Sequence, residues 1–114
     1  MIDLHTHTTA SDGRRTPAEL VACAAAAGVT VLSVTDHDTS AGCDAAAAAC
    51  VEAGIEFVPG IEITAIRADV DIHVLGYFID LGSAALVTFL ADQRRRRLCG
   101  AAPRLRRTGH WRRL

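Results

Sequence analysis

Apolar and polar residues alternate strictly at the start of the chain. In residues 2–7 every second side chain is Asp or His, and the positions between them are Ile, Leu and Thr. A period of two is typical of a β-strand, whose successive side chains point to opposite faces. The pattern therefore predicts a strand with Asp3, His5 and His7 on one face, followed by a turn at residues 11–13.

The rest of the chain alternates between helical and strand-like segments. Helices are predicted over residues 17–27, 41–53 and 84–97, and further strands over residues 29–35, 55–63 and 71–79. The first of these strands is a continuous run rich in β-branched side chains, which is typical of a strand buried on both faces. Strands that alternate with helices predict an α/β fold with a mainly parallel sheet or a barrel.

Local signals mark where the first two helices begin and end. Thr16 is a good N-cap, and Glu19, three residues later, completes a capping box. Thr39 or Ser40 is expected to cap the second helix. Gly54 is expected to end that helix, because glycine readily adopts the left-handed conformation that follows a helix.

Length and composition limit the class of protein. A chain of 114 residues holds one domain at most, and 50% of its residues are hydrophobic. It has no apolar run long enough to span a membrane and no signal-peptide pattern, so the cytoplasm is the predicted location. The four cysteines, Cys23, Cys43, Cys50 and Cys99, show no paired spacing and are predicted to be small buried residues rather than disulfides or zinc ligands.

Charge divides the chain into two unequal parts. Residues 1–93 hold three Arg and all thirteen acidic residues, whereas residues 94–114 hold nine Arg and no acid. In the last predicted helix, Leu86, Phe89 and Leu90 can share a face, with the arginines at the solvated end. Such asymmetry indicates either a nucleic-acid-binding tail or a segment of different origin.

His and carboxylate side chains gather near the ends of the predicted strands. Beyond the first strand, these residues are Asp12, Asp36, His37, Glu62 and His73. Ligands of α/β folds collect at the carboxyl ends of strands, so these groups are expected at one rim. Each alone could be structural; His73, for example, could be a hydrogen-bonded core histidine. Together, nitrogen and carboxylate ligands without thiolates suit zinc, manganese or iron.

Five segments of the chain resemble the PHP (polymerase and histidinol phosphatase) superfamily. They are Asp-Leu-His-Thr-His at 3–7, Ser-Asp-Gly at 11–13, Thr-Asp-His-Asp at 35–38, Pro-Gly-Ile-Glu at 59–62 and Ile-His-Val-Leu-Gly-Tyr at 72–77. More narrowly, they are similar to its bacterial phosphoesterase branch, which includes 3′,5′-nucleoside bisphosphate phosphatases and 5′–3′ exoribonucleases. The resemblance covers residues 2–97 and implies a distorted (β/α)₇ barrel with a trinuclear metal site.

The same resemblance implies a role for each candidate residue. The implied metal ligands are His5, His7, Asp12, His37, Glu62 and His73, and the implied supporting residues are Asp3 and Asp36. His5 and His7 would bind a first ion, with Glu62 bridging to another. Asp12 and His37 would bind the second ion. Glu62 would also hold the third, together with His73, and Asp3 would orient His5 or His7.

The implied chemistry is metal-dependent hydrolysis of phosphate esters of nucleotides, such as nucleoside 3′,5′-bisphosphates or RNA 5′ ends. Up to three ions of manganese, zinc or iron would turn a bound water into hydroxide at neutral pH and clamp the phosphate oxygens. No protein nucleophile is identified. The alternative is a non-catalytic PHP-type module that binds nucleic acid or a polymerase-like partner.

The chain is shorter than the resemblance requires. A (β/α) barrel needs on the order of 200 or more residues, so residues 1–97 are expected to form a partial PHP domain that lacks the C-terminal half of the barrel and its ligands. We expect the chain alone to be weakly active or inactive.

The helical pattern stops at residue 98, and residues 98–114 resemble nothing in the family. They could be a basic tail whose Trp111 stacks on a nucleic-acid base, or a disordered solvated end. A reading-frame shift near codon 98 of a GC-rich gene is favoured over both. Out-of-frame GC-rich codons yield mostly Arg, Ala, Gly and Pro, and the pattern is lost abruptly inside a helix.

Overall fold

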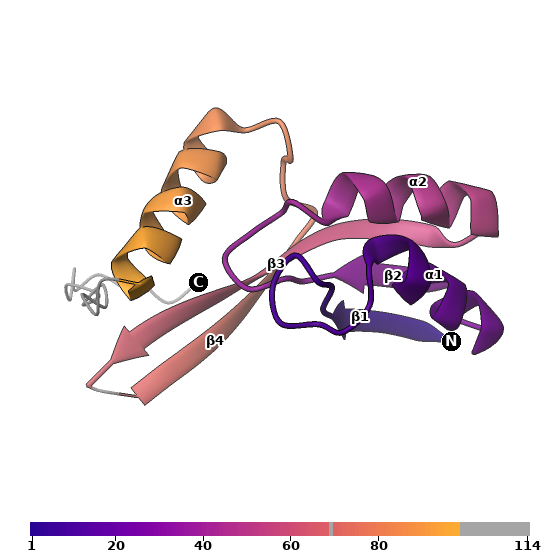
Figure 1. The fold of residues 1–114 in the computed structure, drawn as a ribbon, viewed down its shortest axis with the longest axis horizontal. Coiled ribbons are helices and arrows are strands. Elements are labelled where there is room, and N and C mark those ends of the chain that lie inside the picture. The colour runs from indigo at the N-terminus through magenta and orange to yellow at the C-terminus, as the bar shows by residue number, and fades with distance from the viewer. Residues whose placement is uncertain (69, 99–114) are drawn as a thin grey trace, which may run out of the picture.

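The computed structural model describes residues 1–68 and 70–98, which form four strands and three helices (Figure 1). In chain order they are β1 (Ile2–Thr6), α1 (Pro17–Ala26), β2 (Val31–Val34), α2 (Cys43–Ala53), β3 (Glu56–Arg67), β4 (Val70–Tyr77) and α3 (Ala84–Leu98). Each predicted helix and strand is present, so the α/β order expected from the sequence is confirmed.

The four strands lie in the order β1-β2-β3-β4. The pairs β1–β2 and β2–β3 are parallel, as predicted, whereas β3 and β4 form an antiparallel hairpin. The long strand β3 changes partner along its length: it pairs with β2 up to Pro59 and with β4 from Gly60 onward. Figure 1 shows the hairpin running away from the part of the sheet that α1 and α2 cover. The third strand is longer than predicted because Thr64–Arg67 pair with Val70–His73.

The start of α1 is as predicted, but the start of α2 is not. The Thr16 side chain accepts a hydrogen bond from the Glu19 N–H at 3.3 Å, and Glu19 Oε2 accepts one from the Thr16 N–H at 2.8 Å. Helix α2 begins later than predicted, with Gly42 as an N-cap that makes no side-chain capping bond. A Cβ at Gly42 would lie 2.8 Å from both Asp36 Oδ2 and Thr8 Oγ1, so the tight contact there excludes a capping side chain.

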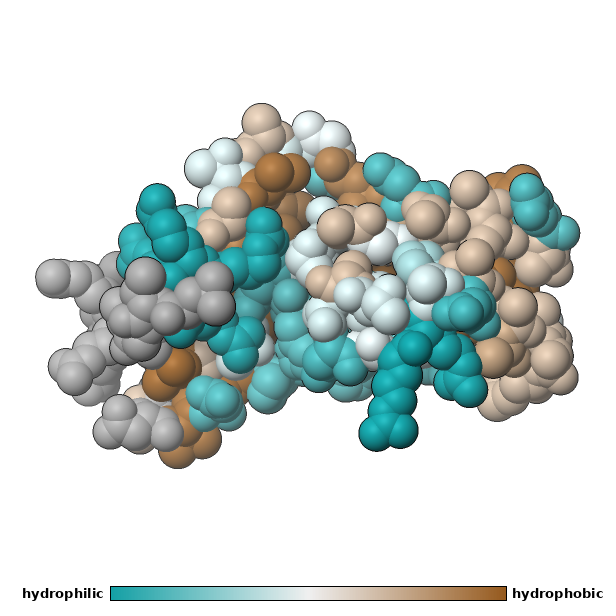
Figure 2. Space-filling model, viewed as in Figure 1, coloured by the Kyte–Doolittle hydropathy of each residue, from teal (hydrophilic) through white to brown (hydrophobic). Residues whose placement is uncertain are grey.

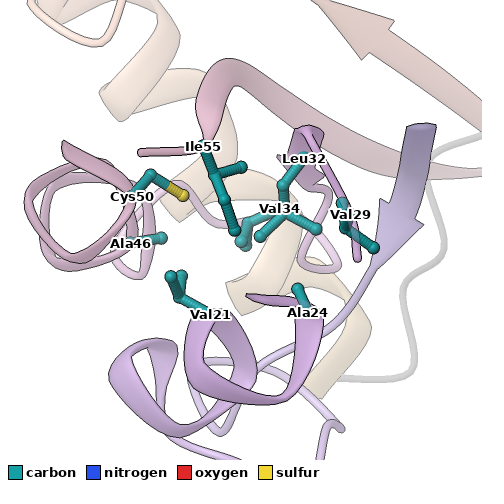
Figure 3. Packing of buried hydrophobic residues seen from close by; sticks show 8 residues of the cluster. All are labelled: Val21, Ala24, Val29, Leu32, Val34, Ala46, Cys50 and Ile55. Carbon is teal, nitrogen blue, oxygen red and sulfur yellow. The ribbon is translucent and has the colours of Figure 1, made fainter. Parts of the chain in front are cut away.

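A small apolar core lies between the sheet and the first two helices. Its buried members are Val21, Ala24, Val29, Leu32, Val34, Ala46, Cys50 and Ile55. Figure 3 shows these side chains converging between the strands and the helices. Alanine on both helices allows close packing, since protein interiors reach the density of organic crystals.

Two of the cysteines contribute to this packing and one does not. Cys43 and Cys50 are buried, as predicted, but Cys23 is exposed, so the prediction was wrong for that residue. Burial raises the pKa of the Cys43 thiol to about 11. The thiol also donates a hydrogen bond to the Gly60 carbonyl. The thiol therefore stays protonated and inert at neutral pH. Cys99 lies outside the described residues.

Helix α3 stands apart from α1 and α2 (Figure 1) and has its own buried stripe. Leu90 and Gln93 are buried and Leu86 is half-buried, whereas Phe89 is 47% exposed. Of the three residues expected to share a face, Leu86 and Leu90 continue with Gln93 along the buried stripe, and Phe89 is the most exposed. Figure 2 shows hydrophilic side chains gathered over the C-terminal end of this helix. None of the helices in the described part of the chain has the length and apolar character needed to cross a bilayer.

Candidate metal centre

Glu62, on β3, is the centre of a cluster of histidines. Its Oε2 atom lies 2.9 Å from His5 Nε2 and 3.1 Å from His7 Nε2. Its other oxygen, Oε1, lies 2.8 Å from His73 Nδ1. The Glu62 side chain is only 5% exposed, whereas those of His5 and His73 are about half exposed, at 52% and 46%. One buried carboxylate is thus shared by imidazoles from two other strands.

The four imidazole rings form a continuous chain around this carboxylate. Ring centroids are 5.1 Å apart for His5 and His7, 4.6 Å for His7 and His37, and 5.4 Å for His37 and His73. The sequence predicted that His5, His7 and Glu62 approach one another and that His37 and His73 face the same space. This convergence is confirmed.

Asp12 completes the cluster beside His7 and His37. Its two carboxylate oxygens lie 3.5 Å from His7 Nδ1 and 3.5 Å from His37 Nε2. The six side chains form three overlapping groups whose ligand atoms lie within 4.8 Å of one another; the groups are His5/His7/Glu62, His7/Asp12/His37 and His37/Glu62/His73. Each group offers the nitrogen and oxygen donors that a divalent transition metal requires.

A β-bulge in β1 places the first two histidines. The register opposite β2 shifts between Asp3 and Thr6, so strict alternation fails there. Asp3 lies opposite the core residue Leu32 and lines a cavity beneath α1. Its Oδ1 accepts a hydrogen bond from the backbone N–H of His5 at 3.3 Å. The prediction that Asp3 shares a face with His5 and His7 was therefore wrong, because the bulge turns the ligands to the opposite face.

Asp36 holds the loop that carries Asp12. Its carboxylate accepts hydrogen bonds from the Thr8 N–H at 2.7 Å, the Thr8 hydroxyl at 2.6 Å and the Ser11 hydroxyl at 2.6 Å. The loop is also tight, since a Cβ at Gly13 would lie 2.3 Å from the His7 carbonyl oxygen. Asp36, at the end of β2, thus ties the Asp12 loop to the sheet.

Backbone hydrogen bonds fix His37 beside Glu62. The Asp38 N–H donates to the Glu62 carbonyl at 2.9 Å, and the Glu62 N–H donates to the Asp36 carbonyl at 3.2 Å. These two bonds form an isolated parallel bridge between His37 and Glu62. The parallel pairing of β2 with β3 therefore continues past the end of β2 and brings His37 and Glu62 to the same rim.

His73 reaches the cluster by a different route from the one predicted. It lies inside the fourth strand, as expected, but that strand, β4, is antiparallel to β3 and places His73 opposite Thr64. The Thr64 hydroxyl lies 3.5 Å from His73 Nδ1. Because paired residues of a hairpin point to the same face, His73 shares the face of Thr64 and of Glu62, two residues earlier.

The electrostatics of the cluster favour a cation. Burial alone would raise the pKa of Glu62, but the hydrogen bond from His5 and the charges of His37, His5 and His73 outweigh burial and lower it. In addition, the Nδ1 atoms of His7 and His37 are buried and have no hydrogen-bond partner among the residues that the structure describes. Buried polar atoms normally have a partner, so these unpaired ring nitrogens and the donor set fit a bound metal.

Sequence reasoning missed a contact between α3 and Asp38, the residue that follows His37. Arg94 and Arg97, expected only at the solvated end of the helix, both reach Asp38. Arg95 and Arg96 pair with Asp92 near the surface, in line with that expectation. The signal for Arg97 was present in the sequence, because the helical period places it on the stripe of Leu90 and Gln93.

Comparison with known proteins agrees with the family resemblance found in the sequence, over most of the chain. The model of the PHP domain family matches residues 3–102. The 5′–3′ exoribonuclease Rnm of Salmonella typhimurium is 43% identical over 97 residues, which are 83% of this chain and 33% of that protein. The 3′,5′-nucleoside bisphosphate phosphatase of Chromobacterium violaceum is 40% identical over 97 residues, which are 85% of this chain and 34% of that protein.

Solved structures agree with these matches. An amidohydrolase from Chromobacterium violaceum, with bound sulfate and no metal, superimposes with a TM-score of 0.81 at 40% identity, covering 85% of this chain and 34% of its own. A protein from Bifidobacterium adolescentis described as a metal-dependent phosphoesterase gives 0.79 at 39% identity, with coverage of 85% and 34%. The chain thus spans about a third of the length of these relatives. These matches confirm the predicted fold, which is the N-terminal half of a PHP-type barrel with mainly parallel strands.

Proposed function

Because the chain belongs to the PHP domain family, we propose that it forms the metal-binding part of a phosphoesterase that hydrolyses phosphate esters of nucleotides or RNA. The relatives named above are hydrolases. The observation that carries the proposal is the sharing of one buried carboxylate, Glu62, by three imidazoles within 3.1 Å. A purely structural role would not require a chain of four imidazoles at contact distance.

The three overlapping groups of side chains are the proposed metal sites. His5, His7 and Glu62 would hold one ion, and Asp12 and His37 a second. His73 would hold a third ion with Glu62. Bound divalent ions of this kind supply Lewis acidity, which activates water and neutralises phosphate charge.

The side chains of the cluster have complementary tasks in this proposal. The two oxygens of Glu62 face different rings, so this carboxylate is placed to span two ions. Asp36 keeps the Asp12 loop in place through three hydrogen bonds. Asp3 bonds the backbone of His5, and thereby supports the bulged strand rather than an imidazole ring. Water is the proposed attacking group, and no side chain is assigned as nucleophile.

The relatives narrow the class of substrate. One is an exoribonuclease that acts in the 5′–3′ direction, and another is a phosphatase for nucleoside 3′,5′-bisphosphates. Both substrates are phosphate esters of nucleotides, which is the chemistry we propose here. A PHP-type module that only binds nucleic acid or a polymerase-like partner would retain this fold without turnover.

The chain alone is expected to bind Mn²⁺ but to release phosphate at least ~100-fold more slowly than the full-length Chromobacterium violaceum relative, since the loss of even one supporting partner of a metal ligand costs 10–100-fold. His5 and His73 are about half exposed, so water is not excluded from the cluster. Calorimetric titration with Mn²⁺, followed by phosphate release from a nucleoside 3′,5′-bisphosphate, measures both properties.

Each result of this experiment bears on a different part of the proposal. Absence of Mn²⁺ binding would overturn the proposed metal sites. Turnover equal to that of the relative would overturn the expectation that residues 1–114 supply only part of the catalytic site. Metal binding with slow turnover supports the proposal, and a separate fragment holding the remainder of the relative should then raise the rate.

We also propose that residues 98–114 are a segment of different origin, although the family model still matches as far as residue 102. Residues 99–114 lie outside the described residues, and the proposal rests on the loss of helical period and the absence of acidic residues in this segment. The nucleotide sequence around codon 98 tests it: another frame should continue the helix and later encode an Asp-x-His segment. If neither alternative frame does so, the frameshift explanation is wrong, and RNA binding by the tail should be measured.

A further inference from the structure

Asp38, the residue after the candidate ligand His37, has an unusual environment that the proposed metal sites do not explain. It is 1% exposed, and its φ of 51° lies in the left-handed region, which is sterically costly for a residue with a side chain. Such a conformation persists only where several surrounding contacts fix it. The contacts of Asp38 therefore show which interactions stabilise this conformation.

Four hydrogen bonds from two other elements converge on Asp38. On the β3 side, its N–H donates to the Glu62 carbonyl at 2.9 Å, and its Oδ1 accepts from the Thr64 N–H at 3.2 Å. On the α3 side, Arg97 Nη1 lies 2.6 Å from Oδ2, and Arg94 Nη1 donates to the Asp38 carbonyl at 2.5 Å. Asp38 thus links α3 to the strand that carries Glu62.

The Arg97 ion pair is the contact most able to fix this arrangement. A buried carboxylate is costly without a partner, and the Asp38 side chain has 1% exposure against 41% for Arg97. Charge-assisted hydrogen bonds to arginine are also about twice as strong as neutral ones. Without Arg97, Asp38 would retain only the Thr64 N–H as a side-chain partner among the described residues.

We propose that Asp38 and Arg97 are positioning residues that set the place of the His37 imidazole. His37 belongs to two of the three candidate metal groups, whereas the group formed by His5, His7 and Glu62 does not contain it. Because the ion pair fixes the backbone directly after His37, its loss displaces that ring and leaves the His5 side of the cluster in place. The inference that metal binding is affected rests on the proposed function.

The same geometry couples metal binding to the docking of α3. If the Arg97 contact favours the metal-binding position of His37, then a metal on His37 favours the Arg97 contact by the same free energy. Metal should therefore protect α3 from local unfolding. Amide hydrogen exchange along Leu86–Gln93 reads out this coupling independently of enzymatic activity.

The test compares Arg97→Ala with Arg95→Ala in the full chain. Arg95 is the matched control, because it lies on the same helix and pairs with the partly exposed Asp92, away from the cluster. In Arg97→Ala we expect shifted His37 ring signals in NMR spectra of the metal-free protein. We also expect Co²⁺ to bind about 10-fold more weakly where His37 is a ligand, while binding by His5, His7 and Glu62 changes less than about twofold. Arg95→Ala should resemble the wild type in each measurement.

Further variants keep the test decisive. Arg97→Lys retains a positive charge and should restore part of the His37 signal position and of the Co²⁺ affinity. The double variant Asp38→Asn/Arg97→Ala should be no worse than the more affected single variant, because both changes break the same contact. Circular dichroism verifies that each variant is folded.

The inference and the proposed function fail in different ways. Unchanged His37 ring signals and unchanged Co²⁺ binding in Arg97→Ala would overturn the positioning role. If the wild-type chain binds no Co²⁺, the proposed metal sites are wrong, yet the ring signals of the metal-free protein still decide whether Arg97 positions His37. Equal effects of Arg95→Ala and Arg97→Ala would also overturn the inference, since a general loss of helix charge would then suffice.

Discussion

Glu62→Gln is expected to weaken divalent-metal binding at least ~100-fold, which exceeds the 10–100-fold typical for the loss of supporting partners of metal ligands. The substitution removes the negative charge while preserving the size of the side chain. Glu62 belongs to two of the three candidate groups and contacts His5, His7 and His73 directly. Its loss therefore affects every ion that these imidazoles would share.

Glu56→Gln on the same strand is the matched control. Glu56 is exposed and belongs to none of the candidate groups in the described part of the chain. Calorimetric titration with Mn²⁺ and the metal content after dialysis compare the two variants with the wild type. An affinity of Glu62→Gln within twofold of that of Glu56→Gln would show that the carboxylate is not a ligand.

The second large effect is on stability. Leu32→Ala is expected to lower the free energy of unfolding by about 3 kcal/mol, within the range of 2–5 kcal/mol for truncation of a buried leucine. Leu32 is fully buried in β2 and belongs to the core between the sheet and the two helices (Figure 3). The cost combines lost apolar burial with the cavity left behind, which the surrounding chain fills only partly.

Val51→Ala provides the comparison for Leu32→Ala. Val51 lies on α2 but is 81% exposed, so its truncation should change the unfolding free energy by no more than about 0.5 kcal/mol. Urea denaturation followed by circular dichroism measures both variants. If Leu32→Ala is as stable as Val51→Ala, the packing around β2 is not the main source of stability.

Local chemistry explains why the elements could be predicted from the sequence. The capping box of Thr16 and Glu19 depends on residues three positions apart, and it forms as expected. Gly54 adopts the left-handed conformation that ends α2, with φ of 68°. The start of α2 was predicted wrongly. Thr8 and Asp36, which are distant in sequence, lie so close to Gly42 that a capping side chain does not fit there.

The composition of the candidate site could be predicted, but its internal geometry could not. Strand periodicity placed His5 and His7 together, while the bulge that separates Asp3 from them depends on the register with β2. His73 lies inside the fourth strand, as expected, but that strand is antiparallel to β3, a direction that no local pattern specifies. Such register and direction are set by pairing between strands and not by either strand alone.

The contact between α3 and Asp38 was likewise only partly predictable from the sequence. Helical period alone places Arg97 on the buried stripe with Leu90 and Gln93, so its inward position was available from the sequence. Its partner Asp38 is 59 positions away, and nothing local marks the pair. Only the folded chain brings the two residues together.

The sheet order β1-β2-β3-β4 repeats the order of synthesis, which has a consequence for folding on the ribosome. Each strand after β1 finds a pairing partner already made when it is translated. All six candidate ligands lie between His5 and His73. At about 5–20 residues per second, their synthesis takes roughly 3–14 s. The segments that carry the candidate ligands are therefore all made before α3, the helix whose Arg97 contacts Asp38.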